Sequence, residues 1–213
     1  MEKLAIFDID FTITKKETLM ELFKFMMHED CKNIKFIPRA VFSGLMFVLK
    51  IYDERKTKET FLKFLDGIEA EELARIVKKY YKERLSKILY KDAIDKIKEL
   101  KGKGYKIYLI SASPEFYLNE MYAIKEVDKI IGTKFTIKDG RFIRSMDGEN
   151  CKGEEKVKRL KEELEKEKIE VDFKNSYMFS DSLSDKPLFD LVGNPYLINF
   201  KKNHEYIKKL NWN

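Results

Sequence analysis

Short apolar runs alternate with helical patterns over residues 91–200, and few architectures accommodate that alternation. The runs "YKIYLIS" at 105–111, "NSYMFSD" at 175–181 and "NPYLINF" at 194–200 have the length of buried strands. The helical patterns that flank and separate them cover residues 92–104, 114–124, 153–168 and 183–192. Strands that alternate with helices favour a parallel sheet covered on both faces. We therefore predict an α/β fold with a Rossmann-like parallel sheet.

The first strand is expected at residues 4–7 and is separated from the others by a long helical stretch. Apolar residues recur at helical spacing in several segments of that stretch, and none of them reads as a strand. We predict an all-helical cap domain at residues 16–90, inserted into a core domain made of residues 1–15 and 91–213. Within the core, we expect a short buried strand and then a hairpin that turns at Asp139-Gly140. A terminal helix is expected at residues 204–210.

Composition and charge favour an ordinary globular protein over a nucleic-acid-binding one. The chain has 213 residues, and its net charge of +6 comes from 43 basic and 37 acidic side chains. The two signs are interspersed on the expected helix faces, which indicates a solvated surface. No zinc finger, basic tail or RNA-binding aromatic signature is visible. We expect no nucleic acid as a partner, and a monomer or homodimer.

Cysteine usage and the apolar segments bear on location. Cys31 and Cys151 are far apart and have no metal-binding spacing, which suits a reducing compartment. The N-terminus lacks the regions of a signal peptide. Between Arg39 and Lys50 only ten uncharged residues occur, whereas a membrane span needs about 20. We interpret residues 36–52 as a buried helix, with an interfacial helix or an apolar substrate lid as the alternatives, and expect a cytoplasmic protein.

Polar side chains gather where three of the expected strands end. Asp8 and Asp10 follow the first strand, Ser111 ends the second, and Asp181 and Asp185 follow the strand at 175–181. In a parallel sheet the carboxyl ends of the strands share one edge, where ligands bind. Carboxylates that close cannot all ionise without a cation, and oxygen ligands suit Mg²⁺. The sequence therefore predicts a magnesium site at this edge.

If the ligand at this edge is a phosphate, a basic residue is also needed, and one is available just before the strand at 175–181. The segment offers two lysines, Lys152 and Lys156.

The polar strand ends resemble the four motifs of the haloacid dehalogenase superfamily. "FDIDFTIT" resembles the first motif, DxDx(T/V), and "LISAS" resembles the second, an apolar strand that ends in Ser. Lys156 resembles the third motif, and "FSDSLSD" resembles the fourth, in which two acids stand three or four residues apart. The helical insert follows the first motif, as a C1-type cap does. The chain is identified as similar to subfamily IB, the phosphoserine-phosphatase-like group.

This resemblance implies roles for the residues at the predicted crevice. Asp8 matches the nucleophile that becomes an aspartyl-phosphate, and Asp10 matches the general acid/base. Ser111, favoured over Ser113, matches the hydroxyl that binds the transferring phosphoryl group. Lys156 matches the cation that balances the phosphoryl charge. It is preferred to Lys152 because Leu160 follows it by four positions, as in the family pattern.

The resemblance also implies the metal ligands. Asp181 matches an Mg²⁺ ligand, together with Asp8 and the backbone carbonyl of Asp10. Asp185 matches the residue that supports the metal shell or orients Lys156.

The resemblance also indicates which residues would contact the substrate and where this chain differs from phosphoserine enzymes. Glu17 occupies the place of a substrate-contacting glutamate, although it could instead be an acid near the start of a helix. Ala112 stands where phosphoserine enzymes usually have Gly, and its methyl group narrows the room beside the phosphate. The cap lacks the Arg that holds a substrate carboxylate, for which Lys58 would be an imperfect substitute.

The predicted function is that of an Mg²⁺-dependent phosphatase. We expect it to hydrolyse a small phosphate monoester, a small phosphorylated metabolite, through an aspartyl-phosphate intermediate. Asp10 favours a phosphatase over a dehalogenase, because the dehalogenases of this superfamily lack the second acid. The alternatives are a phosphotransferase of the same superfamily and a non-catalytic phosphate-binding regulatory protein. The apolar cap suggests a less polar leaving group than serine.

Overall fold

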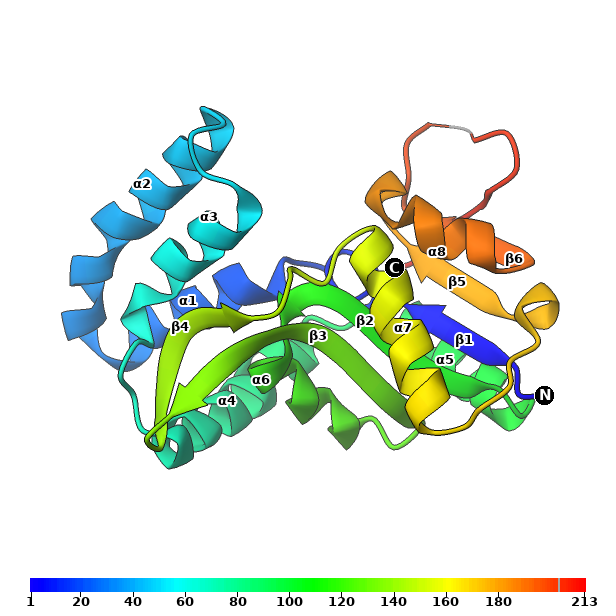
Figure 1. The fold of residues 1–213 in the computed structure, drawn as a ribbon, viewed down its shortest axis with the longest axis horizontal. Coiled ribbons are helices and arrows are strands. Elements are labelled where there is room, and N and C mark those ends of the chain that lie inside the picture. Colours follow the sequence, from blue (N-terminus) through cyan, green and yellow to red (C-terminus); the bar gives the residue numbers. More distant parts are fainter. Residues whose placement is uncertain (203) are drawn as a thin grey trace.

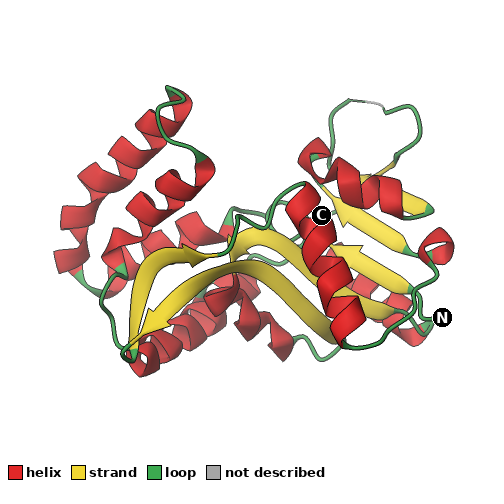
Figure 2. Ribbon diagram, viewed as in Figure 1, coloured by secondary structure: helices red, strands yellow, loops and turns green. Residues whose placement is uncertain are grey.

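A computed structural model describes residues 1–202 and 204–213, and it confirms the predicted α/β fold (Figures 1 and 2). The seven strands form one sheet in the order β4-β3-β2-β1-β5-β6-β7. All neighbouring strands run parallel except β3 and β4. The strands are β1 (Leu4–Phe7), β2 (Lys106–Pro114), β3 (Val127–Lys138), β4 (Arg141–Asp147), β5 (Tyr177–Ser180), β6 (Asn194–Ile198) and β7 (Lys208–Leu210).

Helices cover both faces of the sheet, which explains why the central strands are apolar throughout. Leu4 and Ile6 of β1 belong to one buried cluster with α7 and α8, whereas Ala5 and Phe7 belong to another with α5. Successive side chains of a strand point to opposite faces, so a strand buried on both faces has no polar position. The core helices are α5 (Lys91–Gly102), α6 (Glu115–Leu118), α7 (Glu154–Lys166) and α8 (Lys186–Leu191).

The insert between β1 and α5 is helical, as predicted. It contains α1 (Thr18–Glu29), α2 (Ile37–Val48), α3 (Glu54–Phe61) and α4 (Ala70–Glu83). Figure 1 shows these helices at one end of the sheet, where α2 and α3 form an arm beside the β3–β4 hairpin. An isolated bridge between Thr14 and Leu89 holds the entry and the exit of the insert together. The domain limits at 16 and 90 remain a prediction.

Two predicted elements of the core differ from the structure. The predicted short strand and the first strand of the predicted hairpin are one continuous strand, β3. It has 12 residues and pairs first with β2 and then with β4. The predicted terminal helix at 204–210 is wrong, since Lys208–Leu210 form β7 on the edge of the sheet beside β6. Both lysines of β7 are exposed, and lysines on an edge strand oppose further pairing.

The segment predicted as a buried helix forms a helix, α2, but that helix is largely exposed. Ser43 is its only buried residue, whereas Val41 and Val48 are 65% and 75% exposed. The prediction failed because an apolar composition does not reveal how many neighbours a helix has, and α2 packs mainly on α3. Within residues 1–202 and 204–213, no helix is both long enough and apolar enough to cross a membrane.

Candidate active site

A buried lysine lies between two aspartates at the carboxyl end of β1. The Lys156 ammonium donates hydrogen bonds of 2.7 Å to Oδ1 of Asp8 and 2.7 Å to Oδ2 of Asp185. Lys156 is only 2% exposed. Burial disfavours its charged form, but the two carboxylates outweigh burial and hold the pKa of Lys156 above its ordinary value. Ser180 at the end of β5 donates a further hydrogen bond to Asp185, which fixes that carboxylate.

A tight turn after β1 folds the chain back over Asp8. Phe11 has a φ of 57°, in the left-handed region that non-glycine residues seldom occupy, and the N–H groups of the next three residues all donate to the carbonyl of Ile9. The turn brings the Thr12 hydroxyl to 3.4 Å from Oδ2 of Asp8. The same hydroxyl accepts a 2.9 Å hydrogen bond from the N–H of Asp181. Thr12 therefore connects the first and fourth motifs.

The second aspartate of the first motif is held from two sides. Oδ2 of Asp10 accepts a 2.6 Å hydrogen bond from the hydroxyl of Ser113, and Oδ1 accepts a 2.7 Å hydrogen bond from the N–H of Thr18. Ser111 is connected to this arrangement through Ser113, because the Ser111 hydroxyl accepts a 3.1 Å hydrogen bond from the N–H of Ser113. Asp10 is thus positioned by the end of β2 and by the first residue of α1.

The sequence motifs do not single out Ser113 or Thr18 as site residues. The signal for Ser113 was present in "SAS", where either serine has the right chemistry. Thr18 acts through its backbone N–H, which no side-chain pattern reveals. Its own side chain and carbonyl are fixed by the hydroxyls of Tyr117 and Tyr80, at 2.9 and 2.7 Å.

The carboxylates at this edge fit a hard cation such as Mg²⁺. Burial raises the pKa of Asp8 to about 7, although Lys156 acts in the opposite direction. Burial also raises the pKa of Asp181 to about 6, and the charge of Asp185 adds to that effect. Oδ1 of Asp185 is buried and has no hydrogen-bond partner among the described residues. A cation would compensate this concentration of negative charge.

Residues 1–202 and 204–213 offer no all-protein cage for a metal ion. In the described part of the chain, no three His, Cys, Asp or Glu side chains are grouped as metal ligands. Mg²⁺ does not require such a group, because it commonly takes one or two carboxylates and completes its shell with water and substrate phosphate. The carboxylates of Asp8 and Asp181, with the carbonyl of Asp10, match that requirement.

Two glycines allow the motifs to approach one another. Gly153 is the residue before α7, and its φ of 56° lies in the left-handed region that favours glycine. An added Cβ there would lie 3.7 Å from the carbonyl oxygen of Ser184, and Lys156 follows three residues later. Gly132 of β3 lies beside the end of β2, where an added Cβ would sit 2.9 Å from the carbonyl oxygen of Ser113. A larger residue at Gly132 would displace the Ser111–Ser113 segment.

Lys58 and Glu17, which belong to the insert, lie near the same edge of the sheet. The Lys58 ammonium donates hydrogen bonds of 2.6 Å to the carbonyl of Ala112 and 2.7 Å to the side chain of Asn150. Glu17 accepts a hydrogen bond from the N–H of Met20 and caps α1. Burial, assisted by the charge of Asp10, raises the pKa of Glu17 to about 7. Burial lowers the pKa of Lys58 to about 8.

The structure places the two candidate lysines of the third motif differently. Lys156 lies between Asp8 and Asp185, whereas Lys152 is exposed and pairs with Glu54 of α3. Six predicted site residues lie together at the carboxyl ends of β1, β2 and β5: Asp8, Asp10, Ser111, Lys156, Asp181 and Asp185. Glu17 and Ala112 lie where the insert meets this edge.

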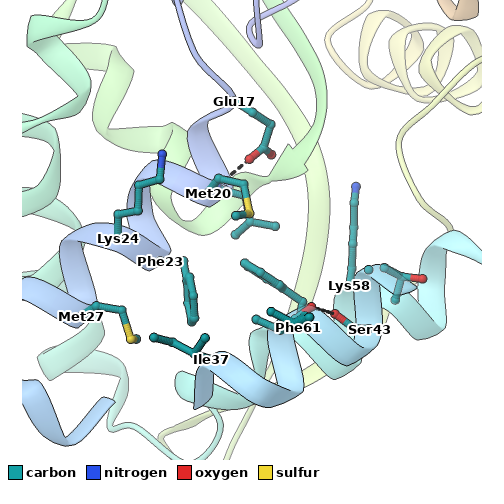
Figure 3. A pocket seen from close by; sticks show the side chains of 14 residues that line it. Glu17, Met20, Phe23, Lys24, Met27, Ile37, Ser43, Lys58 and Phe61 are labelled. Atoms are coloured by element: carbon teal, nitrogen blue, oxygen red, sulfur yellow. Dashed lines mark hydrogen bonds between the residues drawn. The ribbon is translucent and has the colours of Figure 1, made fainter. Parts of the chain in front are cut away.

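A pocket of about 650 Å³ opens between α1, α2 and α3 (Figure 3). Glu17 and Lys58 belong to its lining, and most of the other lining residues are apolar. Lys58 also contacts the carbonyl of Ala112, so one end of this largely apolar pocket lies near the polar edge of the sheet.

Comparison with known proteins finds a family match and several similar proteins. Residues 5–190 match the family model of haloacid dehalogenase-like hydrolases. A probable phosphatase of Mycobacterium tuberculosis is 22% identical over 198 residues, which are 92% of this chain and 68% of that protein. A phosphoserine phosphatase of Methanocaldococcus jannaschii is 24% identical over 165 residues, 75% of this chain and 71% of that protein.

A solved structure has the same fold. It is a Bordetella pertussis protein described as having unknown function, with a TM-score of 0.84 and 21% sequence identity. The match covers 94% of this chain and 92% of that protein.

Proposed function

The chain belongs to the haloacid dehalogenase-like hydrolase family as a phosphatase, and we propose that it hydrolyses a small phosphate monoester through an aspartyl-phosphate on Asp8, with Mg²⁺ as cofactor. The observation that supports this most directly is the buried ion triad of Asp8, Lys156 and Asp185 at the carboxyl end of β1. A buried ion group is costly to the fold, so its presence at a ligand-binding edge favours a catalytic use.

In the first half of the reaction, the carboxylate of Asp8 attacks phosphorus and the bond from phosphorus to the leaving oxygen breaks. Asp10 gives its proton to that oxygen, so that the alcohol leaves neutral. Ser111 hydrogen-bonds the transferring phosphoryl group, and Lys156 balances its charge. Ser113 and Thr18 act as positioning residues, because they hold both oxygens of Asp10.

In the second half, Asp10 takes a proton from a water molecule, and the resulting hydroxide attacks the phosphorus of the acyl phosphate. The bond between phosphorus and Asp8 then breaks, which releases inorganic phosphate and restores both aspartates. Asp8, Asp181 and the carbonyl of Asp10 would hold Mg²⁺, which supplies charge neutralisation between the phosphate and the attacking carboxylate.

Phosphate release from a panel of monoesters, including phosphoserine, tests this proposal. We expect turnover with Mg²⁺ that stops in EDTA and falls at least about 1,000-fold in Asp8→Asn, since an amide cannot attack phosphorus. Asp190→Asn is the matched control, because Asp190 is an exposed aspartate of α8 that pairs with Lys186. Turnover that persists in Asp8→Asn, or a well-folded wild type that releases no phosphate from any ester, would contradict the proposal.

A further inference from the structure

We propose that the leaving group of the substrate is an aliphatic chain, bound in the pocket between α1, α2 and α3; this inference rests on the proposed function. The pocket has a volume of about 650 Å³, a size typical of sites for small organic ligands. Its apolar lining includes Phe23, Met27, Ile37 and Phe61. Figure 3 shows these side chains converging on one space, away from the Glu17 carboxylate and the end of Lys58.

The polar end of the pocket lies beside the reacting groups. Lys58 lines the pocket, and its ammonium contacts the carbonyl of Ala112, the residue next to Ser111. Glu17 also lines it, and the following residue, Thr18, donates its N–H to Asp10. One ester can therefore place its phosphate at Asp8 and extend its leaving group into the pocket.

The polar residues elsewhere in the lining are already bonded within their own segments. The hydroxyl of Ser43 donates to the carbonyl of Ala40, and the hydroxyl of Thr57 donates to the carbonyl of Asp53. The Lys24 ammonium pairs with Glu21. A charged group deep in this pocket would lose its hydration without gaining a free partner, which is unfavourable. A hydrocarbon chain loses nothing there and gains from leaving water.

The outer side of α2 provides the competing explanation. Leu45 is 51% exposed and does not line the pocket, so an apolar ligand or another surface could contact α2 there instead. The pocket is favoured because two of its lining residues, Glu17 and Lys58, lie beside the reacting edge, whereas Leu45 does not line the pocket. Variants on the two sides of α2 separate these explanations.

The test is the specificity constant kcat/KM for n-alkyl phosphates from ethyl to octyl, at concentrations below micelle formation. We expect kcat/KM to rise between about twofold and fourfold per methylene, the upper value corresponding to about 0.8 kcal/mol per buried CH₂. In Gly44→Leu the ratio of octyl to ethyl phosphate should fall at least about tenfold. Gly44 lines the pocket, a Cβ there meets nothing within 4 Å, and Leu is a better helix former than Gly. Leu45→Gln, on the outer side, should keep the wild-type ratio.

Each other outcome has a definite meaning. Hydrolysis that depends on Asp8 but not on chain length would overturn this inference and leave the proposed function standing. Absence of Asp8-dependent hydrolysis for every ester would overturn both. A chain-length dependence that is lost in Leu45→Gln and kept in Gly44→Leu would place the chain on the outer side of α2 and overturn the pocket assignment.

Discussion

At the scale of single residues, the site is a balance of buried charges. Lys156 stays charged because Asp8 and Asp185 both lie within hydrogen-bond distance of it. Removal of one member leaves the others buried without compensation, which is far more costly than loss of an exposed ion pair. The exposed pair of Lys152 and Glu54 offers the comparison within the same segment of the chain.

Replacement of the two lysines should therefore have unequal effects. Lys156→Met should lower the free energy of unfolding at pH 8 by about 3 kcal/mol and abolish phosphate release, because two carboxylates become unpaired in the interior. Lys152→Met should change stability by less than about 1 kcal/mol. Urea denaturation in EDTA and the phosphate-release assay measure the two effects. Equal effects of the two substitutions would show that burial does not distinguish these lysines.

Glu17 should make stability depend on pH. The pKa of Glu17 is about 7 in the folded protein and 4.5 ordinarily, so the folded state binds more protons between these values. The free energy of unfolding must then fall as pH rises through that window. Glu17→Gln keeps an oxygen for the N–H of Met20 but cannot titrate. We expect the variant to gain about 2 kcal/mol relative to wild type between pH 4.5 and 7.

Denaturant titrations at several pH values measure this difference. Glu71→Gln, which changes an exposed glutamate of α4, is the control and should run parallel to wild type. Parallel curves for Glu17→Gln and wild type would contradict the assigned environment of Glu17.

At the scale of elements, the spacing of β2 and β3 sets the position of the second motif. Gly132 allows the two strands to approach where β2 ends, and Ser113 then reaches Asp10. The register of β2 and β3 shifts between Ile110 and Pro114, so the end of β2 departs from regular pairing at Ser111–Ser113. The sequence motif indicates Ser111, but the irregular pairing that orients Ser111 and Ser113 depends on contacts between segments that are distant in the sequence.

Gly132→Ala tests this role of strand spacing. Its Cβ would be 2.9 Å from the carbonyl oxygen of Ser113, so the backbone must move. We expect a loss of about 2 kcal/mol in the free energy of unfolding and a lower kcat. Gly102→Ala is the matched control, because a Cβ there meets nothing within 4 Å, and its stability should be unchanged or raised by up to about 1 kcal/mol. Thermal unfolding of both variants measures these changes in stability. A Gly132→Ala variant as stable as wild type would contradict the close approach of β2 and β3.

At the scale of the whole molecule, the predictable part of the fold is the part with a strong local pattern. Alternating strands and helices predict the core, and their polar ends predict that Asp8, Ser111 and Asp181 share one sheet edge. The resemblance to the third motif adds Lys156. The exposure of α2 and the strand β7 were not predictable, because each depends on which neighbour a segment finds. The apolar pocket joins helices of the insert to that edge, and only the assembled molecule reveals it.

The proposed mechanism requires that Asp8 becomes phosphorylated during turnover. The most direct test uses Asp10→Asn with 4-nitrophenyl phosphate and Mg²⁺, because this leaving group needs no proton whereas attack by water still needs the base. Acid quenching followed by peptide mass spectrometry should locate a hydroxylamine-sensitive phosphoryl group on Asp8. A phosphoryl group on Ser111 or any other residue, or turnover by Asp8→Asn at the wild-type rate, would contradict the mechanism.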